Sequence, residues 1–380
     1  LTMGGVGRGT TIDYVQVSYG NDDGFEWFGG TVNSKYLIST GILDDDFDTD
    51  NGFSGKVQFG VVQRYRTVAD VSTSQAFESD NDAQASYNQP FTSATFSNIT
   101  AIGPVQDTTW TPGSGANQYS TRFGAAAQIR RNSRQSIHNS VFLGWPRGFE
   151  FAQVPTMIAA AGDTIEIRNN SWYGVKGAVL TLAGGTVPAG IDANWLGKAE
   201  YGNVVDKSSP AGAMLENPFP TNIDFNPALK SGSPLASAAK FTGKSADTFF
   251  EKVEHRGAFG LQRWDLPWSE YDPVNREYRA KNPTSVREDD HMRAGITGSV
   301  FPNPTMDAAT VRYQLANADV VTIRLTDATG AVAATFIANA AQQAGVYEFR
   351  LITADLATGL YYLTISGERG TMTTPVTVTR

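Results

Sequence analysis

A phenylalanine followed directly by an acidic residue recurs through the first half of the chain. The pairs are Phe25-Glu26, Phe47-Asp48, Phe77-Glu78 and Phe149-Glu150; the first two lie 22 residues apart and the next step is 30. Each pair follows a β-rich segment that ends in a polar turn. Repeats of about 20–30 residues with this character are typical of a β-solenoid, in which every coil adds short strands to stacked sheets.

A second repeat supports this interpretation. Three asparagines each precede a glycine by four or five residues, in the pairs Asn98/Gly103, Asn139/Gly144 and Asn170/Gly174. Asparagine tolerates the left-handed conformation of a corner, and its amide can bond the equivalent position one rung along. Ordinary hairpin turns are the alternative. We predict that residues 1–175 form stacked parallel coils, with Phe25, Phe47 and Phe77 directed inward.

The composition agrees with an all-β protein. The chain of 380 residues has 38 glycines and only 18% charged residues, which suits short strands joined by tight turns. Its net charge of −8 argues against binding to nucleic acid. The absence of cysteine excludes disulfides and thiolate metal sites. No apolar run approaches the roughly 18 residues of a membrane-spanning helix.

We predict three parts in the chain. Residues 1–275 form a parallel β-helix with a loop-rich C-terminal cap, whose aromatic segment 249–271 covers the open end. Its first residues already look like the middle of a β-domain, so we expect the N-terminal part of the β-helix to be missing. Residues 276–295 form a charged linker, and residues 296–380 form an antiparallel β-sandwich of alternating strands.

The last part closely resembles the type IX secretion C-terminal sorting domain. The resemblance depends on Phe301-Pro302-Asn303-Pro304, Asp327-Ala328-Thr329-Gly330, Ala344-Gly345-Val346-Tyr347 and Gly359-Leu360-Tyr361-Tyr362-Leu363. It implies that the outer-membrane secretion machinery of a Gram-negative cell is a partner, and that the protein is secreted to the cell surface. The implied motif residues are Pro302, Asn303, Pro304, Gly330, Gly345, Tyr347, Gly359 and Tyr361.

The first part resembles the right-handed, pectin-lyase-like parallel β-helix cargo that often precedes this sorting domain. The matching segments are Asp22-Asp23-Gly24-Phe25-Glu26-Trp27 and Asp45-Asp46-Phe47-Asp48. This resemblance implies a fold and carries no established activity.

The acids after each phenylalanine form a predicted ladder of Glu26, Asp48, Glu78 and Glu150, with Asp50 and Asp80 two residues further along their strands. Neighbouring rungs lie about 4.8 Å apart, so ionised carboxylates repel by roughly 1 kcal/mol in water. Three interpretations remain open. The ladder is a solvated acidic face, a Ca²⁺ site formed by Asp48, Asp50, Glu78 and Asp80, or a carboxylate pair for glycoside hydrolysis. Calcium is the one cofactor that the sequence suggests.

Other candidates are Arg130, Arg131 and Arg134 as contacts for an acidic sugar, and Thr108 and Thr164 as O-glycosylation sites. Our first hypothesis is a non-catalytic adhesive or structural surface protein that binds glycan or copies of itself. The second is a polysaccharide lyase or hydrolase, and of the two the sequence favours a protein that is not an enzyme. An enzyme should place arginine or lysine beside the ladder in a groove, whereas a structural protein should show a flat face.

Overall fold

A computed structural model describes residues 1–219, 225–266, 268–276 and 296–380. The chain divides into two units, Leu1–Asn275 and Arg276–Arg380. The first is built around two large parallel sheets and the second from antiparallel sheets, which confirms the predicted fold class. Of the predicted linker, only Arg276 is among the described residues. Within the described part of the chain, every helix is too short or too polar to cross a membrane.

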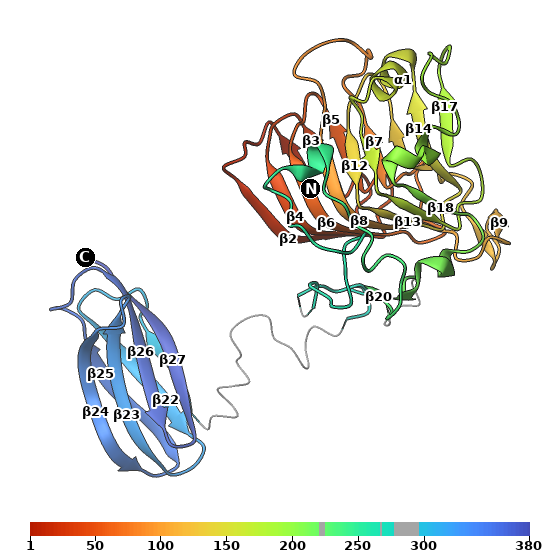
Figure 1. The fold of residues 1–380 in the computed structure, drawn as a ribbon. Helices are drawn as coiled ribbons and strands as arrows, with labels where there is room; N and C mark the ends of the chain where they lie inside the picture. The colour runs from red at the N-terminus through yellow and green to blue at the C-terminus, as the bar shows by residue number, and fades with distance from the viewer. Residues whose placement is uncertain (220–224, 267, 277–295) are drawn as a thin grey trace. The chain divides into compact units, whose positions relative to one another are not determined.

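The first sheet stacks one short strand from each successive coil (Figure 1). All its strands are parallel, and Phe25, Phe47 and Phe77 are direct partners on neighbouring strands. Its strands in spatial order are β1 (Thr2–Gly4), β3 (Phe25–Phe28), β5 (Phe47–Asp50), β7 (Phe77–Ser79), β11 (Ala125–Ile129), β14 (Arg147–Ala152) and β17 (Leu180–Ala183).

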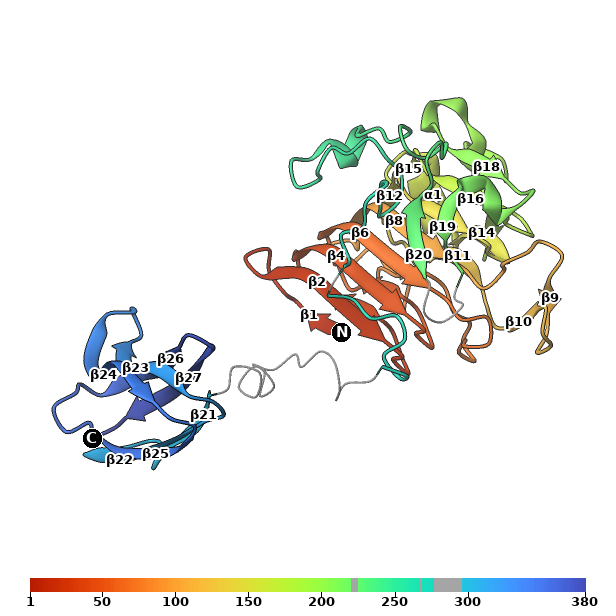
Figure 2. The same cartoon turned by 90° about the horizontal axis from the view of Figure 1, so that it is seen from below.

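The second sheet is formed by the other strands of the same coils, which lie side by side in Figure 2. It is also parallel throughout. Its strands are β2 (Thr11–Ser18), β4 (Asn33–Thr40), β6 (Lys56–Gln63), β8 (Thr95–Ile102), β12 (Ser136–His138), β13 (Val141–Leu143), β15 (Ile167–Arg168), β16 (Ser171–Tyr173) and β18 (Val204–Asp206). The longest of them are β2, β4, β6 and β8.

One column of left-handed residues bends the second sheet. The positions in register across the coils are Tyr14, Tyr36, Phe59, Asn98, Asn139 and Asn169, with φ between 49° and 61°. Bulky residues rarely adopt this conformation, which costs about 1–3 kcal/mol each. Stacking of the rings offsets part of that cost, since Tyr14 and Tyr36 lie 4.4 Å apart and Tyr36 and Phe59 lie 5.1 Å apart.

The predicted asparagine corner is confirmed for Asn98 and Asn139, but its third member is Asn169. Asn170, the residue that we predicted, lies one position further on. Its Oδ1 accepts a hydrogen bond from the backbone N–H of Ser140 at 2.8 Å, so it joins two rungs of the β-helix.

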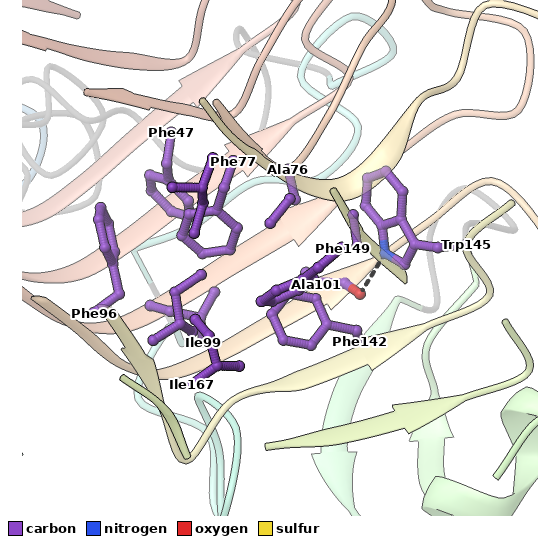
Figure 3. Packing of buried hydrophobic residues seen from close by; sticks show 14 of the residues in the cluster. Phe47, Ala76, Phe77, Phe96, Ile99, Ala101, Phe142, Trp145, Phe149 and Ile167 are labelled. Atoms are coloured by element: carbon purple, nitrogen blue, oxygen red, sulfur yellow. Dashed lines mark hydrogen bonds between the residues drawn. The ribbon is translucent and has the colours of Figure 1, made fainter. Parts of the chain in front are cut away.

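Aromatic rings fill the space between the two sheets (Figure 3). Phe25, Phe47 and Phe77 are fully buried, with ring centroids 5.7 Å and 5.3 Å apart, as predicted. Phe96 closes the stack from the second sheet at 5.0 Å from Phe77. The buried indole of Trp145 donates to the carbonyl of Ala101 at 3.1 Å, which leaves its polar atom satisfied.

The segment that we predicted as an end cap covers a side of the β-helix. Trp264 packs on Tyr36 at 5.2 Å, and Phe259 joins the outward residues Ile38 and Val61 in one buried cluster. The reason is that strands β4 and β6 carry apolar residues on their outward face, and burying these is favourable.

Short elements complete the first unit. Helix α1 (Val154–Ala161) follows β14 and buries Met157 and Ala160. The remaining pairs are β9 (Thr111–Pro112) with β10 (Gln118–Tyr119) and β19 (Leu215–Asn217) with β20 (Asn226–Leu229), and the 3-10 turns are Trp195–Gly197, Ala199–Tyr201, Pro210–Ala213 and Gly243–Ala246.

The second unit has two antiparallel sheets around its own core. One sheet has the order β21-β22-β25 and the other β24-β23-β26-β27. Strand β21 was not predicted, because it precedes the first clear alternation at Ala309. The strands are β21 (Ile296–Phe301), β22 (Ala308–Leu315), β23 (Asp319–Asp327), β24 (Val332–Gln342), β25 (Gly345–Ile352), β26 (Gly359–Gly367) and β27 (Gly370–Val378).

Candidate functional site

The acidic ladder lies on the outward face of the first sheet. Glu26, Asp48 and Glu78 are partners on the adjacent strands β3, β5 and β7. The next rung, on β11, carries Gln128, and Glu150 follows on β14. The ladder is therefore continuous over three rungs and interrupted before the fourth acid.

Two of the predicted arginines contact this ladder. Arg130 forms ion pairs with Glu78 and Asp80, and Arg131 forms one with Asp80 at 2.7 Å. Arg130 also donates to Gln128 at 3.0 Å. Arg130 directly follows β11 and therefore lies one rung beyond Asp80. The arginines and the acids thus form one network on the face of the sheet.

Arg134 lies apart from that network. Its guanidinium stacks on the ring of Phe91, 3.5 Å from the ring centroid. The two predicted glycosylation residues are half-buried. Thr108 donates to the carbonyl of Ser208 at 3.3 Å, and the carbonyl of Thr164 accepts a bond from Lys244.

Acids from the preceding turns also reach the ladder, and we did not predict them. Asp23 and Asp45 each lie two residues before a core phenylalanine, and this shared offset was the available signal. The backbone N–H of Asp45 donates to Asp23 at 2.9 Å, and that of Gln75 donates to Asp45 at 2.6 Å. The side chains of Asp23 and Asp45 therefore form a second ladder, in which each accepts a hydrogen bond from the backbone of the next turn.

Burial and mutual repulsion alter the acidity of these groups. Burial, together with the charges of Asp44 and Glu26, raises the pKa of Asp23 to about 7, against the opposing effect of the hydrogen bond from the backbone of Asp45. Burial also raises the pKa of Glu78 to about 7, against the opposing effect of Arg130. The pKa of Asp48 lies well above its usual range because of burial and then the charge of Asp23.

Two sets of three carboxylates have oxygens within 4.8 Å of one another among the described residues: Asp22, Asp23 and Asp44, and Asp23, Glu26 and Asp48. The second set includes two residues of the ladder. Oδ1 of Asp48 is shielded from solvent and has no hydrogen-bond partner among the described residues. Ca²⁺ prefers such oxygen ligands. Of the four ligands that we predicted, Asp48 belongs to the set with Asp23 and Glu26. Glu78 and Asp80 accept hydrogen bonds from arginine, and Asp50 accepts one from the backbone N–H of Asn51.

We expect Asp48→Asn to raise the melting temperature in chelator at pH 8. The pKa of Asp48 is higher in the folded protein than in the unfolded chain, where it is near 3.8. Such a group stabilises the fold at pH values below the unfolded-state pKa, and this stability is lost as the pH rises through the folded-state pKa. Asparagine resembles the protonated form, so the gain is present at pH 8 and vanishes near pH 4.

Thermal unfolding at both pH values, in chelator and in millimolar calcium, checks this expectation. Glu216→Gln serves as control, since Glu216 is an exposed acid on β19. A wild-type midpoint that rises with calcium, and no longer rises in Asp48→Asn, supports the metal site. An unchanged midpoint supports a solvated acidic face, and a drop in the midpoint of Asp48→Asn contradicts the repulsion argument.

A polar cavity of about 420 Å³ lies elsewhere on the first unit. It was not predicted, because its residues come from three distant segments of the chain. Glu166 lies at its wall and accepts the backbone N–H of Lys244 at 3.0 Å. Arg168, also at the wall, pairs with Asp163. The lining residues are Glu166, Arg168, Asn169, Ala199, Glu200, Gly202, Lys240, Thr242 and Gly243.

Asn303 ties the start of the second unit to its last strand. Its side-chain N–H donates to the carbonyl of Pro375 at 2.7 Å, and its Oδ1 accepts the N–H of Thr377 at 2.8 Å. The turn that contains Pro302 and Pro304 is thereby fixed against β27.

The other predicted motif residues occupy turns and the core of the sandwich. Gly330 adopts φ 89° in the turn before β24, and Gly345 and Gly359 begin β25 and β26. Tyr347 stacks on Tyr313 at 5.3 Å. Tyr361 is buried and donates to the carbonyl of Ala357 at 3.0 Å.

Each of the two units matches a known protein family. Residues 1–194 match the model of the pectate-lyase-like β-helix domain. The chain belongs to the pectate-lyase-like β-helix family. Residues 299–379 match the secretion system C-terminal sorting domain. A search of curated proteins found no match.

The sorting domain establishes where this β-helix protein acts. It directs the chain to the type IX secretion machinery, and so to the cell surface. The resemblances stated from the sequence, to this sorting domain and to the β-helix, are both confirmed.

Proposed function

We propose that this secreted β-helix is a non-catalytic binding protein that contacts surface glycan through its acidic ladder. The observation that carries the proposal is the spacing of the carboxylates. Oxygens of Asp23, Glu26 and Asp48 lie within 4.8 Å of one another. Glycoside hydrolases separate their two carboxyl groups by about 5–5.5 Å or 6.5–9.5 Å, with one acid and one base in distinct surroundings.

The arginines near the ladder support the same proposal. Arg130 already binds Glu78 and Asp80, so its charge is neutralised by the protein. Carboxylates and guanidinium groups in one network provide both acceptors and donors for sugar hydroxyls. Such a face suits hydrogen bonding to a glycan chain.

A polysaccharide lyase or hydrolase is the second candidate, and one observation favours it. The structure brings arginine beside the acidic ladder, which is one of the two features that we expected of an enzyme, the other being a groove. In that case Glu78, whose pKa is raised to about 7, is the group suited to proton transfer near neutral pH.

The two candidates are separated by incubating the full chain with polygalacturonate and with neutral polysaccharides. We expect the full chain to bind polysaccharide without releasing reducing ends or unsaturated fragments from it. Glu78→Gln with Arg130→Gln should weaken binding about tenfold or more, whereas Glu216→Gln should not change it. Release of fragments by the wild type that is lost in Glu78→Gln would establish the enzyme instead.

A further inference from the structure

The two outward sheet faces of the sorting domain differ in charge. On β23, β26 and β27 the residues between the buried ones point outward, and all of them are described. Among these, Arg324 alone is charged. The outward residues are Val320, Thr322, Arg324, Thr326, Leu360, Tyr362, Thr364, Ser366, Thr371, Thr373, Pro375 and Thr377. We call this surface the Leu360 face.

The opposite sheet presents a charged surface. Its outward residues on β22 and β25 include Arg312, Glu348 and Arg350, and Arg312 is the direct partner of Glu348 across the strands. Two exposed apolar residues, Val346 and Ile352, stand at the two ends of β25, with 55% and 51% of their surfaces accessible. This second surface is the Arg312 face.

The Leu360 face has an apolar centre. Leu360 and Tyr362 are 42% and 37% exposed and point the same way on β26. Tyr362 is the partner of Thr326 on one side and Pro375 on the other. Hydroxyl groups surround this centre, and the Oγ1 atoms of Thr364 and Thr373 lie 3.1 Å apart.

Such a surface is typical of a protein contact. The buried centres of protein interfaces are depleted in charge and enriched in aromatic residues, with a polar rim. A partner that covered the Arg312 face would have to compensate Arg312, Glu348 and Arg350, because burying an unpaired charge is costly. The Leu360 face requires less compensation, because Arg324, the strand partner of Thr364, is the one charged residue among its outward positions on β23, β26 and β27.

We propose that the type IX secretion machinery binds the sorting domain through the Leu360 face, at a contact centred on Leu360 and Tyr362. The family match identifies the domain as one that a secretion system recognises. The difference in charge between the two faces then indicates which face of the sorting domain the secretion machinery contacts. This proposal does not depend on glycan binding by the β-helix.

The experiment introduces lysine on each face and measures the amount of full-length protein at the cell surface. Leu360→Lys and Tyr362→Lys place an uncompensated charge at the proposed contact, so export should fall by about tenfold or more. Val346→Lys and Ile352→Lys are matched controls, since each also replaces an exposed apolar residue in the same domain. Both should be exported like the wild type.

Leu360→Thr separates loss of contact from loss of fold. It removes the apolar side chain without adding charge, so export should fall, but by less than in Leu360→Lys. Thermal unfolding of each purified full-length variant confirms that the sandwich is intact. Normal export of Leu360→Lys and Tyr362→Lys, or an equal loss in the two controls, would overturn the assignment of the face.

Discussion

Removal of residues 296–380 is expected to abolish export while the β-helix remains folded inside the cell. The sorting match lies entirely within the deleted part, at residues 299–379. The buried cluster of the sandwich draws its residues from Ile296–Val378, whereas the clusters of the β-helix draw theirs from Met3–Tyr271. Neither core loses a residue when the other is removed. Protease accessibility at the cell surface measures export, and circular dichroism with thermal unfolding measures folding.

A reciprocal fusion provides the control for this deletion. Residues 296–380 are attached to an unrelated carrier that reaches the periplasm, and the fusion should appear at the cell surface. Export of the truncated β-helix at the level of the full chain would refute the sorting assignment. Misfolding of the truncated chain would instead show that the β-helix requires the sandwich for stability.

The fold was predictable because the repeat in the sequence has a direct physical cause. Equivalent positions of successive parallel coils stack on one another. Phe25, Phe47 and Phe77 therefore share the core, and the acid beside each lies on the outward face of the sheet. The coil that contains β11 could not be recognised from this repeat, because Ala127 occupies the phenylalanine position and Gln128 the acidic position. Long insertions between coils also hid the spacing.

The site was less predictable, because its partners come from different coils. The sequence indicated Asp48, Glu78 and Arg130 separately, but their arrangement depends on which strands are neighbours. Arg130 directly follows β11, which belongs to the coil that the repeat did not reveal, and so its ion pairs with Glu78 and Asp80 were not expected. Asp23 was missed because it stands in a turn, where acids are common for local reasons.

Replacement of Phe47 by alanine is expected to cause a large loss of stability in the β-helix. Phe47 is fully buried, with ring centroids 5.7 Å from Phe25, 5.3 Å from Phe77 and 5.7 Å from Phe96. Its truncation removes apolar burial and leaves a cavity between two rigid sheets, at a cost of about 3–5 kcal/mol. For a unit of this size that corresponds to a fall in the melting midpoint of roughly 10 °C.

Phe28→Ala is the matched control for Phe47→Ala. Phe28 lies on β3, the strand next to Phe47, but points outward and is 38% exposed. Its removal should cost less than about 1 kcal/mol, because its ring is partly exposed and lies outside the buried aromatic cluster. Thermal unfolding of both variants, each compared with the wild type in chelator at one pH, measures the difference. Equal losses in the two variants would contradict an inward aromatic stack as the main source of stability, because only Phe47 belongs to it.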